Sequence, residues 1–351
     1  MAYTTIKKPS DYFNTKLYTG DGTSSRSITG VGFATDMVWL KGRTTTYSHR
    51  LVDKLRTGTY PKLLYPNETS AESEDVNNFV SLDSDGFTIG VGNAVNQSGQ
   101  TYVAWNWLAN GSGSSNSDGS ITSTVSANTT SGFSIVSYTG TGANATVGHG
   151  LGVAPKMIII KNRIDAVNWE VGHDSIGWTK KLRLNTTDAE TVDNGAFNDT
   201  APTSSVFSLG NNGTSNGSGD DMIAYCFADV KGFSKFGSYT GNASLDGTFI
   251  YTGFKPSWVI IKRTDVINSW VMFDNKRNGT YGLSGNPRAR HLYANTNDPE
   301  DSADNYNQVD FVSNGFKLRE DNTTINASGG SYIYMAFAEE PLVGDNPATA
   351  R

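Results

Sequence analysis

The sequence contains a single cysteine, Cys226, so no disulfide can form within the chain. Cys226 lies in the apolar run 222–227, which favours a small buried side chain over a reactive nucleophile. Only four histidines are present, and no two of them have the His-x-His or His-x-x-x-His spacing of a zinc site. We therefore expect no transition-metal site and no cofactor.

Basic blocks and long apolar runs are also missing. Lysine and arginine number 28 against 34 aspartates and glutamates, the formal net charge is -6, and no stretch is rich in basic residues. Nucleic-acid binding needs basic groups that neutralise phosphates, so we expect no such function. No apolar stretch approaches the ~20 residues of a membrane-spanning helix. Residues 1–9 lack the apolar core of a secretory signal, so we expect no signal-peptide export and no membrane insertion.

Helical periodicity is absent from every window longer than about ten residues. The chain instead has 38 glycines and frequent turn signals, such as the Asn-Gly pairs that begin at Asn212, Asn278 and Asn314. Short apolar runs such as 157–160 are bounded by Pro155 and Lys161, as expected of strands covered on both faces. The sequence therefore predicts an all-β chain.

The strongest positive signal is a pattern that occurs three times. Each copy begins with Tyr-Thr-Gly, continues with an apolar run ending in lysine and a second run ending in aspartate, and closes on an aromatic strand. The matched positions are Tyr18, Tyr138 and Tyr239; Lys41, Lys161 and Lys262; Asp53, Asp174 and Asp274; and Phe87, Phe207 and Phe316. The spacing widens between Asp274 and Phe316, and we place the insertion around 295–304, because a polar surface loop tolerates added residues.

These landmarks predict three tandem, diverged antiparallel β-sandwiches of a jelly-roll or lectin-like type. The predicted divisions are an attachment segment at 1–15, repeats at 16–109, 132–230 and 233–340, a Gly/Ser/Thr-rich linker at 110–131 and a tail at 341–351. A strand within 121–125 of the linker is an added expectation. The sequence leaves open whether the repeats form beads in a row or a closed body with pseudo-threefold symmetry.

The repeated charges, Lys41 and Asp53 with their counterparts, have two interpretations. A catalytic centre is needed only once per chain, so a charge found in every repeat favours a structural ion pair or a turn cap. Asp83 and Asp85 resemble the start of a calcium loop, but the glutamate that should follow is missing, and a turn before a strand is the better interpretation. We predict no catalytic residue, and bound calcium stays an open question.

Most tryptophans lie in the repeat-defining strands and are predicted to belong to the core. Trp178 and Tyr281 fall outside the aligned strands. They are the candidates for a binding site that stacks on a sugar ring, and no other binding residue stands out.

The repeat pattern resembles that of virion proteins of marine bacteriophages. The resemblance rests on Lys41-Gly-Arg43, Lys161-Asn-Arg163, the closing strand 102–107 and the two ends of the chain, 1–14 and 336–342. The third repeat departs from it, because Lys262 is followed by Arg263 and Thr264. The resemblance implies a tail-fibre-like structural protein of the virion, made in the host cytoplasm and released by lysis, with no catalytic residues.

On this basis we expect a non-enzymatic tail fibre or appendage that contacts the host surface. A capsid decoration or knob protein is the alternative within the same class, because the long shaft of a fibre is absent. A carbohydrate-binding, lectin-like module is a second alternative. A polysaccharide depolymerase would need paired carboxylates in a groove, and no pair stands out. The expected partners are other virion proteins, a host surface glycan and further copies of the chain in a homo-oligomer.

Overall fold

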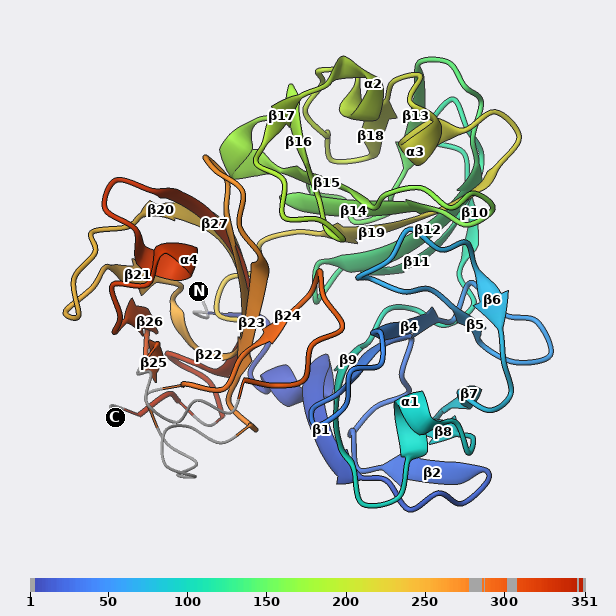
Figure 1. The fold of residues 1–351 in the computed structure, drawn as a ribbon. Helices are drawn as coiled ribbons and strands as arrows, with labels where there is room; N and C mark the ends of the chain where they lie inside the picture. The colour runs from blue at the N-terminus through green and yellow to red at the C-terminus, as the bar shows by residue number, and fades with distance from the viewer. Residues whose placement is uncertain (1–3, 278–285, 287, 302–307, 346, 350–351) are drawn as a thin grey trace.

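The computed structural model describes residues 4–277, 286, 288–301, 308–345 and 347–349. The prediction of an all-β, antiparallel fold is confirmed, because the sheets are antiparallel and the few helices span only three or four residues. The strands form three sandwich-like units around a common centre (Figure 1). We call them unit 1 (13–107), unit 2 (114–227) and unit 3 (234–341). None of the described helices has the length and apolar character needed to cross a membrane.

Unit 1 packs a four-stranded sheet, in the order β1-β9-β3-β4, over a three-stranded sheet, β2-β8-β7. Its elements are β1 (Phe13–Thr19), β2 (Arg26–Thr29), β3 (Met37–Gly42), β4 (Arg50–Asp53), β5 (Lys62–Leu63), β6 (Ser73–Glu74), β7 (Phe79–Asp83), β8 (Gly86–Ile89), α1 (Asn93–Asn96) and β9 (Thr101–Trp107). A short 3-10 helix, η1 (Pro9–Asp11), precedes β1.

Unit 2 contains the largest sheet, in the order β10-β11-β12-β19-β14-β15-β16-β17, over the pair β13-β18. The predicted linker supplies its first two strands, β10 (Ser114–Asn116) and β11 (Ser123–Asn128), so this segment is an ordered hairpin. The remaining elements are β12 (Phe133–Thr139), β13 (Ala145–Gly148), β14 (Met157–Asn162), β15 (Glu170–His173), η2 (Asp174–Ile176), β16 (Lys180–Arg183), β17 (Thr191–Val192), α2 (Asn194–Phe197), β18 (Val206–Leu209), α3 (Gly213–Asn216) and β19 (Asp221–Phe227).

Unit 3 packs the sheet β20-β27-β22-β23-β24 over β21-β26-β25. Its elements are β20 (Ser234–Thr240), β21 (Phe249–Tyr251), β22 (Phe254–Arg263), β23 (Trp270–Asp274), β24 (Leu292–Tyr293), β25 (Val309–Val312), β26 (Gly315–Leu318), α4 (Thr323–Asn326) and β27 (Ser331–Pro341). Strand pairing places the added residues between β23 and β24, because Tyr293 already pairs as Arg183 does in unit 2. The predicted position of the insertion, around 295–304, was therefore too late in the chain.

The central strands are buried on both faces, as the continuous apolar runs predicted. In β3, Met37 and Trp39 face a core shared by all three units, whereas Val38 and Leu40 face the core of unit 1 alone. The same alternation occurs in β14 and β22, because side chains of a strand point to opposite faces in turn. Each of these strands thus stabilises both its own sandwich and the packing of the three units against one another.

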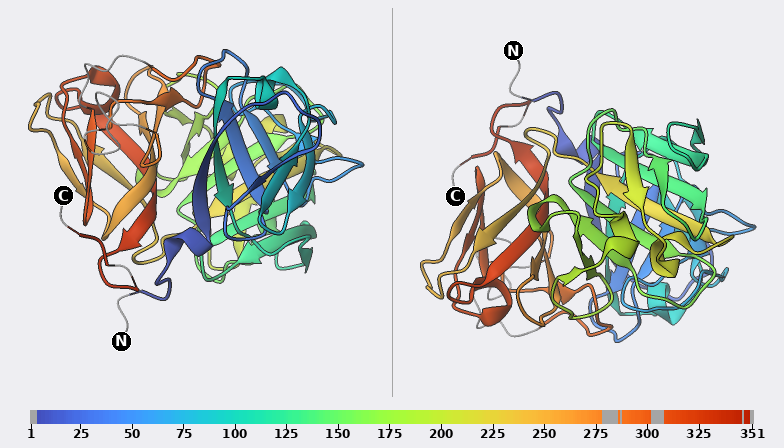
Figure 2. Two further views of the ribbon diagram at one scale, coloured as in Figure 1. Left: turned by 90° about the horizontal axis from the view of Figure 1, so that it is seen from below. Right: turned by 90° about the horizontal axis from the view of Figure 1, so that it is seen from above.

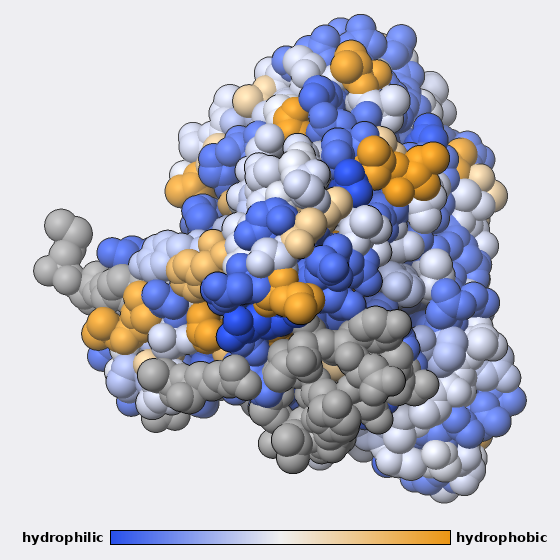
Figure 3. Space-filling view, turned by 60° about the vertical axis from the view of Figure 1, so that its left-hand side comes forward, coloured by the Kyte–Doolittle hydropathy of each residue, from blue (hydrophilic) through white to orange (hydrophobic). Residues whose placement is uncertain are grey.

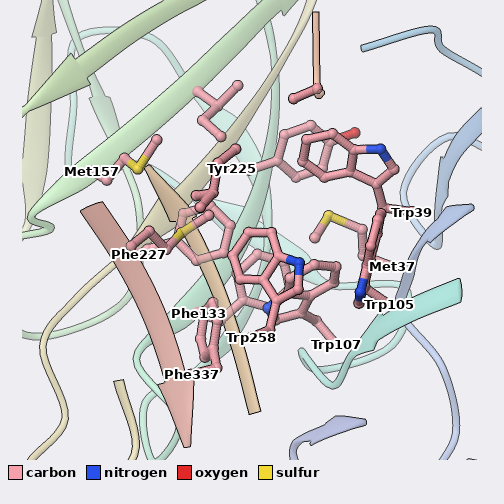
Figure 4. Packing of buried hydrophobic residues seen from close by; sticks show 14 of the residues in the cluster. Met37, Trp39, Trp105, Trp107, Phe133, Met157, Tyr225, Phe227, Trp258 and Phe337 are labelled. Carbon is pink, nitrogen blue, oxygen red and sulfur yellow. The ribbon is translucent and has the colours of Figure 1, made fainter. Parts of the chain in front are cut away.

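The shared core closes the three units into one body. It contains large aromatic side chains from every unit, and Figure 4 shows them converging: Trp105 and Trp107 from unit 1, Phe133 and Phe227 from unit 2, and Trp258 and Phe337 from unit 3. Separate clusters fill the interior of each sandwich. The repeats therefore form a closed pseudo-threefold body rather than beads in a row.

The segment before β1 is packed against this body. Ile6 is buried in the shared core, and Thr4 lies against Gly232 in the connection between units 2 and 3. The described part of the predicted attachment segment, 4–15, is therefore part of the body, and its last three residues lie in β1. In Figure 2, η1 and the end of β27 lie together at one end of the molecule, and α1 and α4 lie at the opposite end.

Candidate functional site

One hydrogen bond recurs at all three interfaces between the units, in cyclic order. A ring nitrogen at the start of β4, β15 or β23 bonds to a backbone carbonyl in the neighbouring unit. The bonds join His49 Nε2 to the Tyr293 oxygen (3.0 Å), Trp169 Nε1 to the Tyr65 oxygen (3.0 Å) and Trp270 Nε1 to the Arg183 oxygen (2.9 Å). Each unit therefore contacts both others through equivalent positions, as in a ring of three subunits.

His49 takes the place of a tryptophan in this cycle. Trp39 Nε1 donates to His49 Nδ1 at 2.9 Å, so Nδ1 is the acceptor and Nε2 carries the proton that is donated to the Tyr293 carbonyl. Burial, with the nearby charge of Lys41, lowers the pKa of His49 well below its usual value. His49 is therefore a neutral hydrogen-bonding group, and both ring nitrogens are occupied by structural partners.

The interface between units 1 and 2 contains a buried ionic cluster. Asp53 and Arg56 are both fully buried, and Arg56 Nε donates to Asp53 Oδ2 at 2.6 Å. The hydroxyl of Tyr225 in unit 2 donates to the same oxygen at 2.6 Å. Beside them, Arg163 of unit 2 makes a bidentate contact with Glu72 of unit 1 at 2.8 and 3.0 Å. This cluster links the two units by charge-assisted hydrogen bonds.

The cluster stabilises the ionised form of the Glu72 carboxylate. Burial alone would raise the pKa of Glu72, but hydrogen bonds and positive charge from Arg163 and Arg56 outweigh it and lower the pKa to about 2. Glu72 therefore stays ionised and cannot act as a general acid near neutral pH.

The interface between units 3 and 1 repeats the cluster. Arg277 Nε donates to Asp274 Oδ2 at 2.6 Å, and Trp105 Nε1 of unit 1 donates to the same oxygen at 3.1 Å. Arg43 of unit 1 makes a bidentate contact with Glu300 of unit 3 at 2.9 and 3.0 Å. The repeated Asp53 and Asp274 are thus structural ion pairs, as the sequence analysis favoured.

Asp174 is not the third member of this set. Asp53 pairs with Met37 and Asp274 with Trp258, whereas the residue that pairs with Met157 is His173. The sequence alignment was wrong by one position here, because an aspartate happens to follow the histidine. Asp174 is partly exposed and forms an ion pair with Lys156 at 2.8 Å.

The interface between units 2 and 3 keeps only the glutamate of the cluster. The Glu190 amide donates to the Thr264 carbonyl at 2.8 Å, and the Glu190 side chain forms an ion pair with Lys180 of its own unit at 2.5 Å. His173, Ile176, Thr264 and Met335 stand where the other interfaces have aspartate, arginine, a second arginine and an aromatic donor. His173 Nδ1 accepts from the amide of Ser175 at 3.1 Å, and its Nε2 lies 3.3 Å from the Tyr334 oxygen. Neutral groups at all four positions avoid leaving any single buried charge unpaired.

The repeated lysines are buried hydrogen-bond donors. Lys41 Nζ donates to the carbonyls of Gly42 and Thr45, at 2.8 and 2.9 Å, and Lys161 Nζ donates to two carbonyls of its own turn. Lys262 Nζ donates to the Asn268 carbonyl of its own turn and to the Thr187 carbonyl of unit 2. These bonds hold the turn that follows each central strand. Burial lowers the pKa of Lys41 to about 7 and the pKa of Lys161 and of Lys262 to about 8.

These lysines predict that the protein becomes more stable as the pH rises from about 7 to about 10. In that range the unfolded lysines, with a pKa of 10.5, are still protonated, whereas the folded ones lose their protons, so stability rises with pH. The expected gain is at least about 1 kcal/mol per lysine. Buried tyrosines such as Tyr138, whose pKa is raised by burial, reverse the trend above about pH 10.

Urea denaturation at half-unit pH steps measures this effect. The triple variant Lys41→Met, Lys161→Met and Lys262→Met should show a much flatter curve between pH 7 and 10, because only these side chains have been removed. A wild-type stability that falls steadily over this range would contradict the proposed burial of the lysines.

A repeated asparagine was missed by the sequence analysis. Asn96, Asn216 and Asn326 end α1, α3 and α4, are fully buried, and bond to the loop that follows each Tyr-Thr-Gly. The signal was present, since the three lie at the same offsets as the closing strands. Side chains that bond to backbone leave no hydrophobic pattern, so a search based on apolar runs passed over them.

The Asn216→Ala variant should be about 1–3 kcal/mol less stable than the wild type. Asn216 Oδ1 accepts from the Thr141 amide at 2.8 Å, and Nδ2 donates to the carbonyls of Ala143 and Gly210, both at 2.7 Å. Thermal unfolding measures the loss, and hydrogen exchange at the Thr141 amide locates it. An exchange rate at Thr141 equal to that of the wild type would contradict this role.

Comparison with known families gives one match. The model of a domain of unknown function, DUF7483, matches residues 8–341, which covers nearly all of the sequence and all three units. The chain belongs to the DUF7483 family. No curated protein matches the DUF7483 chain.

Of the two predicted sugar-binding residues, Trp178 lies inside unit 2 of this DUF7483 chain. Trp178 is only 6% exposed and packs edge-to-face on Phe197, with ring centroids 5.4 Å apart. Stacking on a sugar would require opening the core of unit 2. Tyr281 lies outside the described residues.

Other candidates for chemistry have structural roles. Cys226 is fully buried, and burial raises the pKa of its thiol, so it remains a neutral core residue. Asp85 lies in the predicted turn, between β7 and β8, and its carboxylate accepts from the amides of Gly30 and Gly32 in the loop after β2. Within 4–277 and the other described ranges, no group of three or more His, Cys, Asp or Glu side chains could hold a metal ion.

The shared core contains a small cavity of about 10 Å³. It is lined only by apolar and aromatic side chains from all three units, including Met37, Ile159, Tyr225 and Met335. A cavity of this size and character is too small and too apolar to hold a hydrogen-bonded water or a ligand. The DUF7483 core is therefore a packed interior rather than a binding pocket.

Proposed function

We propose that this DUF7483 protein is a non-enzymatic structural component of a bacteriophage virion, acting as a compact knob or appendage. The observation that carries the proposal is the use of the repeated charged residues. The buried lysines, both Asp–Arg pairs and both Arg–Glu pairs hold turns and units together, which leaves none of them facing a substrate. A scaffold function explains why the lysines recur in all three units and the ion pairs at two of the three interfaces.

The shape supports a knob over a fibre shaft. The described residues form one rounded, closed body, and no slender or coiled-coil extension is seen among them (Figures 1 and 2). A rigid β-sandwich body with its strands buried on both faces suits an exposed position on a particle. The similarity of the repeat pattern to marine phage virion proteins is consistent with this position.

Purified particles of the phage that carries the gene provide the test. Mass spectrometry should detect the chain in the particles, and cryo-EM should show a three-lobed density that fits this body. Density at the tail would support contact with the host, and density over the head lattice would support a decoration protein. Absence of the chain from the particles would overturn the proposal.

Lack of enzymatic activity is tested separately. Incubation of the protein with host envelope polysaccharide should release no reducing ends. Release that continues with fresh protein and scales with its concentration would contradict the proposed structural role.

A further inference from the structure

The outer sheets of the three units differ at one pair of positions. The central residues of β2, β13 and β21 are equivalent, because Ile28, Val147 and Ile250 face inward and each pairs with a phenylalanine. The residues on either side of them point outward. These outward positions hold Ser27 and Thr29 in unit 1, Thr146 and Gly148 in unit 2, and Phe249 and Tyr251 in unit 3.

Unit 3 therefore carries two exposed aromatic side chains where its sister units carry small or polar residues. Phe249 is 43% exposed and Tyr251 is 57% exposed, although both belong to a regular strand. Two positions apart on one strand, they lie on the same face of the sheet. Units 1 and 2 form the same sandwich without aromatic residues at these positions, so the two exposed rings are not needed for packing. Exposed aromatic side chains of this kind indicate a binding surface.

Gly315 lies beside these rings, at the position that Gly86 holds in unit 1. It pairs directly with Tyr251. A Cβ atom at this position would lie 2.0 Å from the Ile250 carbonyl oxygen and 3.1 Å from Cε2 of Phe249. The Phe249 ring thus covers the backbone of β26 at a residue with no side chain. Phe249, Tyr251 and Gly315 together form a low aromatic surface, which we call the aromatic face.

Charged groups border the aromatic face. Lys317, which pairs with Phe249 across the sheet, forms an ion pair with Asp246 at 2.7 Å, and Arg319 lies 3.3 Å from the same carboxylate. The Asp246 side chain is 79% exposed, so hydrogen-bonding capacity remains directed to solvent. Donors and an acceptor therefore stand beside an exposed aromatic surface.

This combination suits a sugar ring. A pyranose presents C–H groups on its faces, which pack on aromatic rings, and hydroxyls around its edge, which need donors and acceptors together. A lipid or an aliphatic peptide would gain nothing from the paired charges. A nucleic acid would be repelled by Asp246 and by the net charge of -6.

The size of the surface also disfavours a protein partner. A stable protein interface buries about 800 Å² on each partner and involves about 20–30 residues a side. On the side of the molecule seen in Figure 3, apolar residues form small separate groups among hydrophilic ones. Two aromatic rings and the nearby exposed Leu245 fit one or two sugar residues much better than a second copy of the chain.

We propose that the aromatic face of unit 3 binds a glycan, with Phe249 and Tyr251 stacking on sugar rings and Asp246 and Lys317 bonding to hydroxyls. The inference deepens the proposed function, since it names the class of host-surface partner and the unit that contacts it. Comparison of the three units supports the assignment of binding to unit 3, because units 1 and 2 have the same fold and lack the aromatic pair.

Affinity electrophoresis tests the binding. Native gels are cast with soluble polysaccharides of known composition, including glucan, mannan, galactan and alginate, and with extracted host envelope polysaccharide. The wild-type protein should be retarded by at least one of them. The variant Phe249→Ala with Tyr251→Ala should bind at least tenfold more weakly, and Asp246→Asn should bind several-fold more weakly.

The sister unit supplies a matched control. The variant Ser27→Ala with Thr29→Ala changes the equivalent outward positions of unit 1 and should be retarded like the wild type. All variants should keep the wild-type melting temperature, since the altered side chains are exposed. Failure of every polysaccharide to retard the wild type, or unchanged retardation of the aromatic variant, would overturn the inference.

Two further results separate this inference from the proposed function. Sedimentation of the wild type as a dimer, with a monomer for the aromatic variant, would show that a second copy covers the face and would overturn glycan binding. If the chain is found in phage particles but binds no polysaccharide, the glycan inference fails and the structural function stands. If it binds a polysaccharide but is absent from particles, the reverse holds.

Discussion

The Arg56→Ala variant is expected to lose about 3–5 kcal/mol of folding stability. Arg56 and Asp53 are fully buried, and removal of the guanidinium leaves the aspartate with a negative charge and no cation beside it. The substitution also removes donors to the Leu51 and Lys62 carbonyls and to Glu72. Urea denaturation measures the loss.

The protein contains its own control for this prediction. The interface between units 2 and 3 has neutral groups at the positions equivalent to Asp53, Arg56 and Tyr225, so the variant Asp53→His, Arg56→Ile and Tyr225→Met copies an arrangement found in this chain. We expect this triple variant to be clearly more stable than Arg56→Ala, because no buried charge is left unpaired. A cost for Arg56→Ala below about 0.5 kcal/mol, typical of a surface substitution, would contradict the structural role.

The Trp258→Ala variant should be destabilised by about 3–5 kcal/mol. Trp258 is fully buried in the shared core, and its ring centroid lies 6.2 Å from that of Trp105 and 5.8 Å from that of Trp107, both in unit 1. The cavity left by the indole therefore removes contacts between units as well as within unit 3. Trp258→Phe retains part of the ring and should lose less.

The location of the stability loss in Trp258→Ala shows whether the units are energetically coupled. Because the core is shared, hydrogen exchange should become faster in the central strands of unit 1 as well as in those of unit 3. Faster exchange confined to unit 3 would mean that the units are energetically separate, even though they are in contact.

The sequence predicted the class of fold well because the relevant signal is local. The run 157–160 and its counterparts alternate between two buried faces, and this appears as unbroken hydrophobicity within a few residues. Fixed offsets between copies then gave the number of units. Both predictions depend on short segments, and neither requires knowledge of which distant residues these segments contact.

The interfaces could not be predicted, because their partners lie far apart in the sequence. Tyr225 donates a hydrogen bond to Asp53, which lies 172 residues earlier in the sequence. The sequence around either residue gives no indication that the other is its partner. His173 was missed for a related reason, since its interface lacks the buried Asp–Arg pair and the neighbouring Asp174 matched the repeat by residue type. Repeats identify equivalent positions, but not which unit each one contacts.

The prediction of Trp178 as a binding residue was wrong for a different reason. Trp178 was chosen because it fell outside the aligned strands, but it packs in the core of unit 2. Phe249 and Tyr251 lie in the strand β21 and were not among the predicted binding residues. Only the pairing of β21 with β26 shows that they point away from the interior.

Differential scanning calorimetry of the full chain tests most directly whether the three units form one closed body. The shared core and the cyclic contacts predict a single transition in which the calorimetric enthalpy equals the van't Hoff enthalpy. Three independently unfolding units of similar size would instead give a calorimetric enthalpy about three times the van't Hoff value, or three resolved transitions. A ratio near one would support the closed body, and a ratio near three would contradict it.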